Sequence, residues 1–269
     1  MKEAKKGLDH RMSRIQLSHE VPLRMLEKSR DFNDYDYALV HLFEKYPQYY
    51  DFFKESLAQG REVILDNSIF ELGTAFSASE FAYWIKQLKP TKYIIPDVLG
   101  NAEGTISNLE GWFKEYADIE GIAMGVVQGY DYESLTRCYK AVDRACDEIA
   151  ICFHYPYYDQ THFGRMVGRQ TLIDRWLKEG VINEEKKHHL LGCSLPQEFS
   201  HYTGEKYSWI NSLDTSNPII HGMEGHPYKN GALNFKVKNK LADNMEADLL
   251  PLQVGTIYYN IEEFKKNLE

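Results

Sequence analysis

The chain has 269 residues, of which 43% are hydrophobic and 26% charged, and its formal net charge at pH 7 is -9. This composition is typical of a globular protein and gives no indication of disorder. The acidic net charge disfavours tight nonspecific binding to nucleic acid, which depends on a basic surface. Lysines and arginines are nevertheless concentrated in two places, residues 2–14 and residues 236–240.

The sequence contains no apolar run near the roughly 20 residues that a membrane helix needs. Its basic N-terminus lacks the apolar core of a secretory signal, so we expect a cytoplasmic protein without a membrane partner. The four cysteines, at 138, 146, 152 and 193, show neither metal-ligand spacing nor a disulfide pattern. We expect them to be reduced and buried, and we expect no metal and no cofactor.

Short apolar segments alternate with helical patterns along the whole chain. Apolar residues recur at helical spacing at Ala82, Ile85 and Leu88, and capping residues in "SASE", "NAEG" and "DYES" mark helix starts. We expect strands within residues 37–43, 62–67, 92–98, 121–129, 147–153, 188–194, 207–214 and 217–223.

The expected strands are apolar throughout rather than alternating, which is typical of a parallel sheet covered on both faces. Eight strands alternating with helices in a chain of this length predict an α/β fold, a (β/α)8 TIM barrel. No linker divides the chain, so we expect one domain over residues 1–269. It would have an N-terminal arm over about residues 1–30 and a C-terminal helical segment over about residues 230–269.

Polar residues follow one expected strand after another. Asp66 precedes Asp97 by 31 residues, and Asp97 precedes Gln128 by 31 residues, which matches one βα unit per interval. Because the carboxyl ends of parallel strands open onto one face, we expect these side chains to line one pocket. An aspartate after a strand is usually a turn former or helix cap, but three polar strand ends in register favour a site. The full set is Asp66, Asn67, Asp97, Gln128, Gly129, His154, Cys193, Ser194, Asp214, His221 and Glu224.

Two carboxylates facing one pocket can serve as nucleophile and general acid or base at a sugar anomeric carbon. A third carboxylate and a glutamine amide can pair with the polar edge of a flat heterocycle, while Phe70 or Tyr130 stacks on its face. His154 and His162 fit a packed lid. His188 and His189 lie beside a strand start, and we expect them on the surface.

The segments "LDNSIFE", "IPDV", "GVVQG", "AICF", "LLGCSLPQEF" and "SLDTSNP" occur in this order between about residues 63 and 218. Together they resemble the tRNA-guanine transglycosylase superfamily, (β/α)8 enzymes that exchange guanine for a 7-deazaguanine. The resemblance implies that Asp214 is the nucleophile and Asp66 the general base. It also implies a substrate-binding set of Asn67, Phe70, Asp97, Gln128, Gly129, Cys152, Phe153 and Gly192, with the backbone near Cys152 and Phe153 orienting the base.

The chain also departs from this family. The zinc-binding cysteine cluster is missing, and Ser68, Ile69 and Glu71 stand where the family has two glycines and a glutamine. Because the zinc subdomain helps to dock tRNA, its loss disfavours tRNA as substrate. The chain most resembles the short zinc-free phage enzymes that insert 7-deazaguanines into DNA. The expected partners are therefore DNA, less favourably tRNA, and a free 7-deazaguanine, in the host cytoplasm if the protein is phage-encoded.

Other interpretations of the same residues stay open. They are a related enzyme acting on RNA, an N-glycoside hydrolase using water, a carbohydrate hydrolase, and an inactive barrel that binds a partner. The basic N-terminal arm and residues 153–163 are candidates for holding an extruded nucleotide. The aromatic residues in segment 46–53 would pack in the core, line a groove or form a subunit interface, so a homo-oligomer also stays open.

Overall fold

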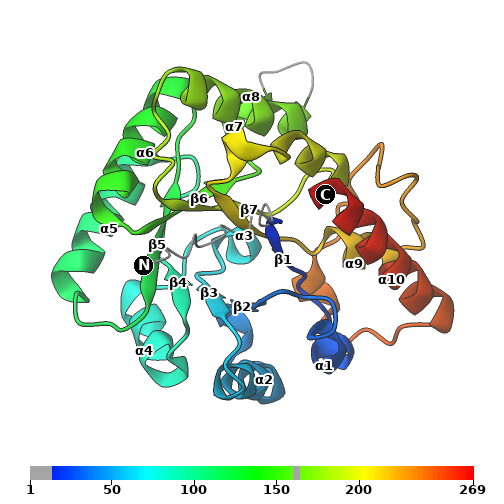
Figure 1. Ribbon diagram of the computed structural model, residues 1–269. Coiled ribbons are helices and arrows are strands. Elements are labelled where there is room, and N and C mark those ends of the chain that lie inside the picture. Colours follow the sequence, from blue (N-terminus) through cyan, green and yellow to red (C-terminus); the bar gives the residue numbers. More distant parts are fainter. Residues whose placement is uncertain (1–13, 160–163) are drawn as a thin grey trace, which may run out of the picture.

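The computed structural model describes residues 14–159 and 164–269 of the chain. In these residues, eight parallel strands form one sheet in the order β1-β8-β7-β6-β5-β4-β3-β2, and helices surround it (Figure 1). The sheet is nearly closed into a barrel, which confirms the expected (β/α)8 architecture. The strands are β1 (Gln16–Ser18), β2 (Asp36–Leu39), β3 (Val63–Asp66), β4 (Lys92–Ile94), β5 (Ile122–Val127), β6 (Glu148–Cys152), β7 (Lys187–Leu191) and β8 (Ile210–Asp214).

Helices follow most of the strands and form the outer layer in Figure 1. The α-helices are α1 (Leu26–Ser29), α2 (Pro47–Ala58), α3 (Ile69–Leu72), α4 (Ala78–Leu88), α5 (Ala102–Glu115), α6 (Tyr132–Ala145), α7 (Pro156–Asp159), α8 (Gly164–Lys178), α9 (Asn217–Met223) and α10 (Pro251–Lys265). Short 3-10 helices occupy Leu23–Met25, Val40–Leu42, Pro196–Tyr202, Glu205–Tyr207, Leu241–Asn244 and Lys266–Leu268. Within the described ranges, no helix is both long enough and apolar enough to cross a membrane.

The capping residues start their helices as expected. The side chains of Ser77, Asn101 and Asp131 accept hydrogen bonds from backbone N–H groups in the first turns of α4, α5 and α6. These bonds satisfy donors that have no partner inside the helix. Ala82, Ile85 and Leu88 lie on the buried face of α4, as their spacing predicts.

The barrel is closed at its seam by hydrogen bonds that involve both backbone and side-chain groups. The edge strands β1 and β2 are not paired in the sheet, but Asn33 and Asp34 connect them. The Asp34 backbone N–H donates to the Leu17 carbonyl at 2.9 Å, and the Leu17 N–H donates to the Asp34 carboxylate at 2.8 Å. The Asn33 side-chain amide forms two hydrogen bonds with the His19 backbone: Oδ1 accepts from the N–H at 2.8 Å, and Nδ2 donates to the carbonyl at 2.9 Å. These bonds replace a strand ladder and hold the end of β1 inside the ring.

One expected strand is wrong. Residues 217–223 form helix α9, with Pro218 in its first turn, where proline is tolerated because that N–H has no intrahelical partner. The remaining strand of the barrel is β1, which pairs with β8 and lies within the segment expected as an arm. Three residues with one exposed side chain gave too little pattern to predict it.

The expected surface position of His188 and His189 is also wrong. The strand does start beside the pair, since β7 begins at Lys187, but both side chains are only 1% exposed. His188 bonds with Tyr139 in the outer layer, and His189 faces the barrel interior, where it stacks on Tyr37. All four cysteines are buried and free, as expected.

A buried ion pair supports the loops that follow β6 and β7. Arg169 of α8 and Glu198 are both fully buried, and the Arg169 Nε donates to the Glu198 carboxylate at 2.6 Å. The same guanidinium donates to the carbonyls of Leu191 at 3.0 Å and Gly192 at 2.9 Å. The pair therefore fixes the backbone at the carboxyl end of β7.

We expect Arg169→Met to destabilise the protein by about 3–5 kcal/mol, because it leaves the buried Glu198 carboxyl without its cation. The measurement is the free energy of unfolding in urea. The double variant Arg169→Met/Glu198→Leu should be more stable than the single variant, since no unpaired charge is left. A single variant as stable as the double one would contradict this account.

Candidate functional site

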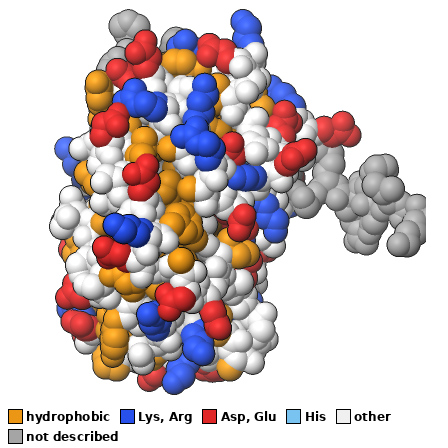
Figure 2. Space-filling model, turned by 90° about the vertical axis from the view of Figure 1, so that its left-hand side faces the viewer, with side chains coloured by type: hydrophobic (Ala, Val, Ile, Leu, Met, Phe, Trp, Pro, Cys, Tyr) orange, Lys and Arg blue, Asp and Glu red, His pale blue; other side chains and the backbone are white. Residues whose placement is uncertain are grey.

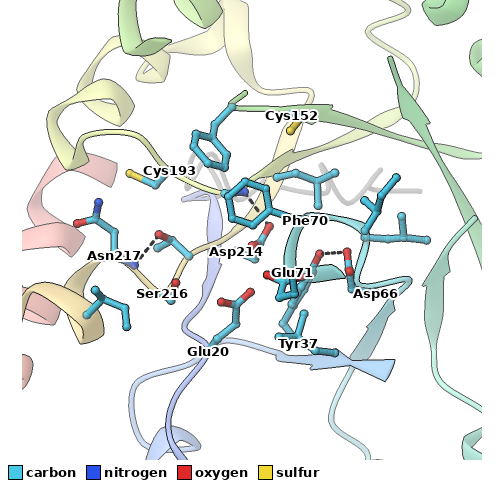
Figure 3. A pocket seen from close by; sticks show the side chains of 18 of the residues that line it. Glu20, Tyr37, Asp66, Phe70, Glu71, Cys152, Cys193, Asp214, Ser216 and Asn217 are labelled. Atoms are coloured by element: carbon cyan, nitrogen blue, oxygen red, sulfur yellow. Dashed lines mark hydrogen bonds between the residues drawn. The ribbon is translucent and has the colours of Figure 1, made fainter. Parts of the chain in front are cut away.

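The carboxyl ends of the strands surround a pocket of about 870 Å³, open solvent at its mouth included. The expected site residues that line it are Asp66, Asn67, Phe70, Asp97, Gln128, Cys152, Phe153, Gly192 and Asp214. Figure 3 shows the side chains of Glu20, Glu71 and Asp214 turned into the same space, with Asp66 beside them. The convergence expected from the 31-residue spacing is therefore present.

Gly129 does not line the pocket. A Cβ at this position would lie 2.7 Å from the backbone nitrogen of Leu135, so the glycine allows α6 to pack closely against the end of β5. The neighbouring Tyr130 is 59% exposed and also lies outside the pocket. His162, expected in a lid, and the basic arm up to residue 13 lie outside the described residues.

Asp97 is the centre of an amide network on one wall. Its two carboxylate oxygens accept hydrogen bonds from Asn67 Nδ2 at 2.9 Å and Gln128 Nε2 at 2.6 Å. The Gln128 oxygen in turn accepts from the Gly100 N–H at 3.0 Å. Burial raises the pKa of Asp97, while the bonds from Asn67 and Gln128 oppose that rise. Each carboxylate oxygen keeps a lone pair and Gln128 Nε2 keeps a second hydrogen, so this wall can still pair with a polar ligand edge.

Asp214 stands at the end of β8 with one oxygen held and the other free. Oδ1 accepts from His189 Nε2 at 3.0 Å and from the Gly192 backbone N–H at 3.1 Å. Because a carboxylate only accepts, Nε2 carries the imidazole proton, and Nδ1 accepts from the Ser212 hydroxyl at 2.8 Å. No donor among the described residues contacts Oδ2. A carboxylate held in this way has a fixed orientation and one oxygen available for attack.

Asp66, at the end of β3, has both oxygens engaged. The Tyr37 hydroxyl donates to Oδ2 at 2.7 Å, and the Ser68 N–H donates to Oδ1 at 2.5 Å. Ser68 adopts the left-handed region, with φ at 61°, which turns its N–H back toward the carboxylate. Burial and the nearby Glu71 raise the pKa of Asp66 well above its usual range, against these two bonds. A carboxyl with a raised pKa holds its proton to higher pH than an ordinary aspartate, and after releasing the proton it is a stronger base.

Two further carboxylates, Glu20 and Glu71, belong to the site and were not predicted as members. Burial and the neighbouring Asp214 raise the pKa of Glu20 well above its usual range. Burial raises the pKa of Glu71 to about 7, with Asp214 adding to the effect. Ionised carboxyl groups in one pocket repel one another, so Glu20, Asp66 and Glu71 hold their protons to higher pH than exposed carboxyl groups do. Glu20 lies two residues after the short β1, so recognising that strand would have revealed it.

Gly192 brings β7 and β6 together at the pocket wall. Its φ is +64°, and a Cβ there would lie 2.5 Å from the Phe153 ring, so only glycine fits without displacing that ring. The expected role of the backbone near Cys152 and Phe153 is disfavoured, because its donors are already used. The Cys152 N–H donates to Tyr155 Oη at 2.9 Å, and the Phe153 N–H donates to the Leu191 carbonyl at 3.0 Å. These two residues line the pocket with their side chains instead.

Comparisons with known proteins give no relative, since no protein-family model matches the chain and no curated protein is significantly similar to it. Among residues 14–159 and 164–269, no group of three or more His, Cys, Asp or Glu side chains is arranged to hold a metal ion.

We expect Glu71 to make the stability of the protein dependent on pH. Its folded pKa of about 7 lies above the ordinary value of 4.5, so the folded state holds the proton longer than the unfolded state. The associated stability is fully present below pH about 4.5 and is lost as the pH rises to about 7. Urea unfolding at about pH 5 and pH 8 should show a larger loss for the wild type than for Glu71→Gln. Equal losses would contradict the assigned burial of this carboxyl.

Proposed function

We propose that the protein is a base-exchange transglycosylase that replaces guanine in DNA with a 7-deazaguanine derivative. The observation that carries this proposal is the pairing, in one pocket, of an oriented carboxylate with a free oxygen and an amide wall. Asp214 supplies the first and the network around Asp97 supplies the second. This combination suits a nucleotide whose sugar carbon faces Asp214 and whose base edge faces Asp97 and Gln128.

In the proposed first displacement, Asp214 Oδ2 attacks C1' of the target nucleotide. A C1'–O bond forms, the glycosidic C–N bond breaks, and its electron pair leaves with guanine, which takes a proton from Asp66. In the second displacement, the Asp66 carboxylate removes the ring N–H proton of the incoming deazaguanine. The resulting nitrogen attacks C1', and the bond to Asp214 breaks. Two inversions give net retention.

Each proton transfer in this scheme requires a carboxyl group that can hold a proton and then release it. The raised pKa of Asp66, caused by burial and by Glu71, supports this role. Phe70 is 41% exposed at the mouth and lies 5.5 Å from Phe153 between ring centroids, so the two rings offer apolar faces to a base. We propose DNA rather than tRNA as the substrate because the sequence lacks the zinc-binding cysteine cluster of the tRNA-guanine transglycosylases that it resembles.

The proposal is tested by incubating the protein with DNA or tRNA containing labelled guanine, together with a panel of free 7-deazaguanines. Mass spectrometry of the polymer then scores release and incorporation. We expect exchange in DNA alone, and a loss of about a thousandfold or more in Asp214→Asn. The exposed Asp118→Asn on a surface turn serves as the charge-matched control.

Each other result selects another function. Exchange in tRNA would move the acceptor to RNA, and release that leaves an abasic site would mean hydrolysis. Full exchange activity in Asp214→Asn would show that Asp214 is not the nucleophile. If no guanine is released from either DNA or tRNA, the remaining interpretation is an inactive barrel that binds a partner.

We expect His189→Gln to lower the rate of exchange about 10- to 150-fold at saturating substrate, because Asp214 loses a charge-assisted hydrogen bond. Substrate affinity should change little, since His189 does not line the pocket. His188→Gln is the matched control: it removes an equally buried histidine from the same strand that bonds Tyr139 instead. Equal losses in both variants would show that His189 acts only through general stability.

A further inference from the structure

The mouth of the pocket is bordered by a loop between α9 and α10 that carries Lys236, Lys238 and Lys240. We call these three residues the lysine rim. They line an outer hollow of about 880 Å³, solvent included. It shares Phe70, Phe153, Glu20, Glu71 and Lys236 with the inner pocket in front of Asp214. The hollow is therefore the entrance to the pocket, and whatever reaches Asp214 from that side passes the lysine rim.

The lysine rim is fastened to the strand ends on both sides of the mouth. Lys236 Nζ donates to the Cys193 carbonyl at 2.6 Å, after β7. Lys240 Nζ donates to the carbonyls of Phe70 and Glu71, each at 3.3 Å, after β3. The loop backbone is held as well, because the Val237 N–H donates to His221 Nε2 at 3.3 Å. The cations are thus kept at the opening.

Among the described residues, the ammonium groups of the lysine rim have no direct carboxylate partner. In the described parts of the chain, no carboxylate oxygen lies within 4.0 Å of the ammonium groups of the lysine rim. Cations at other positions have such partners: Lys92 pairs with Glu62 and Glu148, each at 3.1 Å. On the flank of the barrel formed by α4, α5 and α6, Figure 2 shows acidic and basic side chains interspersed. Three lysines without an ion-pair partner within the described ranges, close together in a chain of net charge -9, are therefore a local feature that attracts an anion.

Lys238 and Lys240 line only the outer hollow, and Asp66 and Asp214 line only the inner pocket. The rings of Phe70 and Phe153 lie where the two meet. Lys236 Nζ lies 3.8 Å from the Phe153 ring centroid, and Lys240 Nζ lies 5.5 Å from that of Phe70. The Asp66 and Asp214 carboxyl groups in the inner pocket would repel a phosphate. An entering nucleotide therefore keeps its phosphates outside and its base inside. This order matches the parts of an extruded nucleotide: backbone phosphates at the surface, a flat base at the rings, and a sugar near Asp214.

We infer that the lysine rim binds the backbone phosphates that flank the target nucleotide in a single strand or an opened duplex. The inference rests on the proposed function, because it takes the occupant of the pocket to be a nucleotide within a polymer. Lys238, whose ammonium group has no hydrogen bond or ion pair within the described residues, and Lys240, which bonds only to carbonyls, supply the contacts. Lys236 holds the loop in place through Cys193.

The test measures affinity for a fluorescent single-stranded oligonucleotide by anisotropy between about 50 and 200 mM NaCl. Each lysine–phosphate contact to a single strand contributes about 0.7 to the slope of log affinity against log salt. We expect Lys238→Gln/Lys240→Gln to reduce the slope by about 1.4 and to weaken binding. Lys140→Gln, on the exposed face of α6, should keep the wild-type slope.

The outcomes separate this inference from the proposed function. An unchanged slope in the double variant overturns the phosphate role even if the wild type exchanges bases in DNA. If the double variant has a reduced slope but the wild type performs no exchange, the phosphate-binding role of the lysines is supported. The proposed transglycosylase activity is then overturned. If free dGMP competes as strongly as the oligonucleotide, the inference that the lysine rim binds a polymer backbone is overturned. The site would then be one for a free nucleotide. Absence of oligonucleotide binding by the wild type would also overturn the inference.

Discussion

Parallel strand pairing is the constraint on which the site depends. All eight strands run in one direction, so their carboxyl ends meet at one rim, and the register decides which residues become neighbours there. Ser18 pairs with Asp214 and Leu39 pairs with Asp66, which brings the ends of β1 and β3 into the space in front of β8. A slip of one residue in either pair would turn the carboxylate away from the barrel interior.

The two ends of the barrel treat buried charge differently. At the amino ends, Lys92 is nearly buried between Glu62 and Glu148, so its charge is compensated. At the carboxyl ends, Glu20, Asp66, Glu71 and Asp214 line one pocket, and Lys236, which also lines it, forms no ion pair with these described carboxyl groups. Burial, and next the neighbouring carboxyl groups, raise the pKa of Glu20, Asp66 and Glu71. The amino end therefore pairs its buried charges, whereas the carboxyl end places carboxyl groups together whose pKa values are raised.

The interior of the barrel connects the carboxylates that the proposed chemistry uses. His189 of β7 holds Asp214, and its ring stacks on Tyr37 of β2 at 5.9 Å between centroids. The Tyr37 hydroxyl in turn holds Asp66. A single aromatic layer thus orients one carboxylate from β8 and another from β3. Movement of either ring would disturb both groups, because buried side chains in a packed interior have few alternative positions.

The sequence by itself predicted the barrel and the caps of three helices, and nine of the ten residues expected at the site line the pocket. It could do so because apolar runs, capping residues and the regular spacing of Asp66, Asp97 and Gln128 are local signals. Tertiary structure decided the rest. The short β1 was recognisable only through its pairing with β8, and Gly129 proved to be a packing residue because α6 approaches it. The roles of Glu20, His189 and the lysine rim depend on contacts between segments far apart in the chain, which no local pattern encodes.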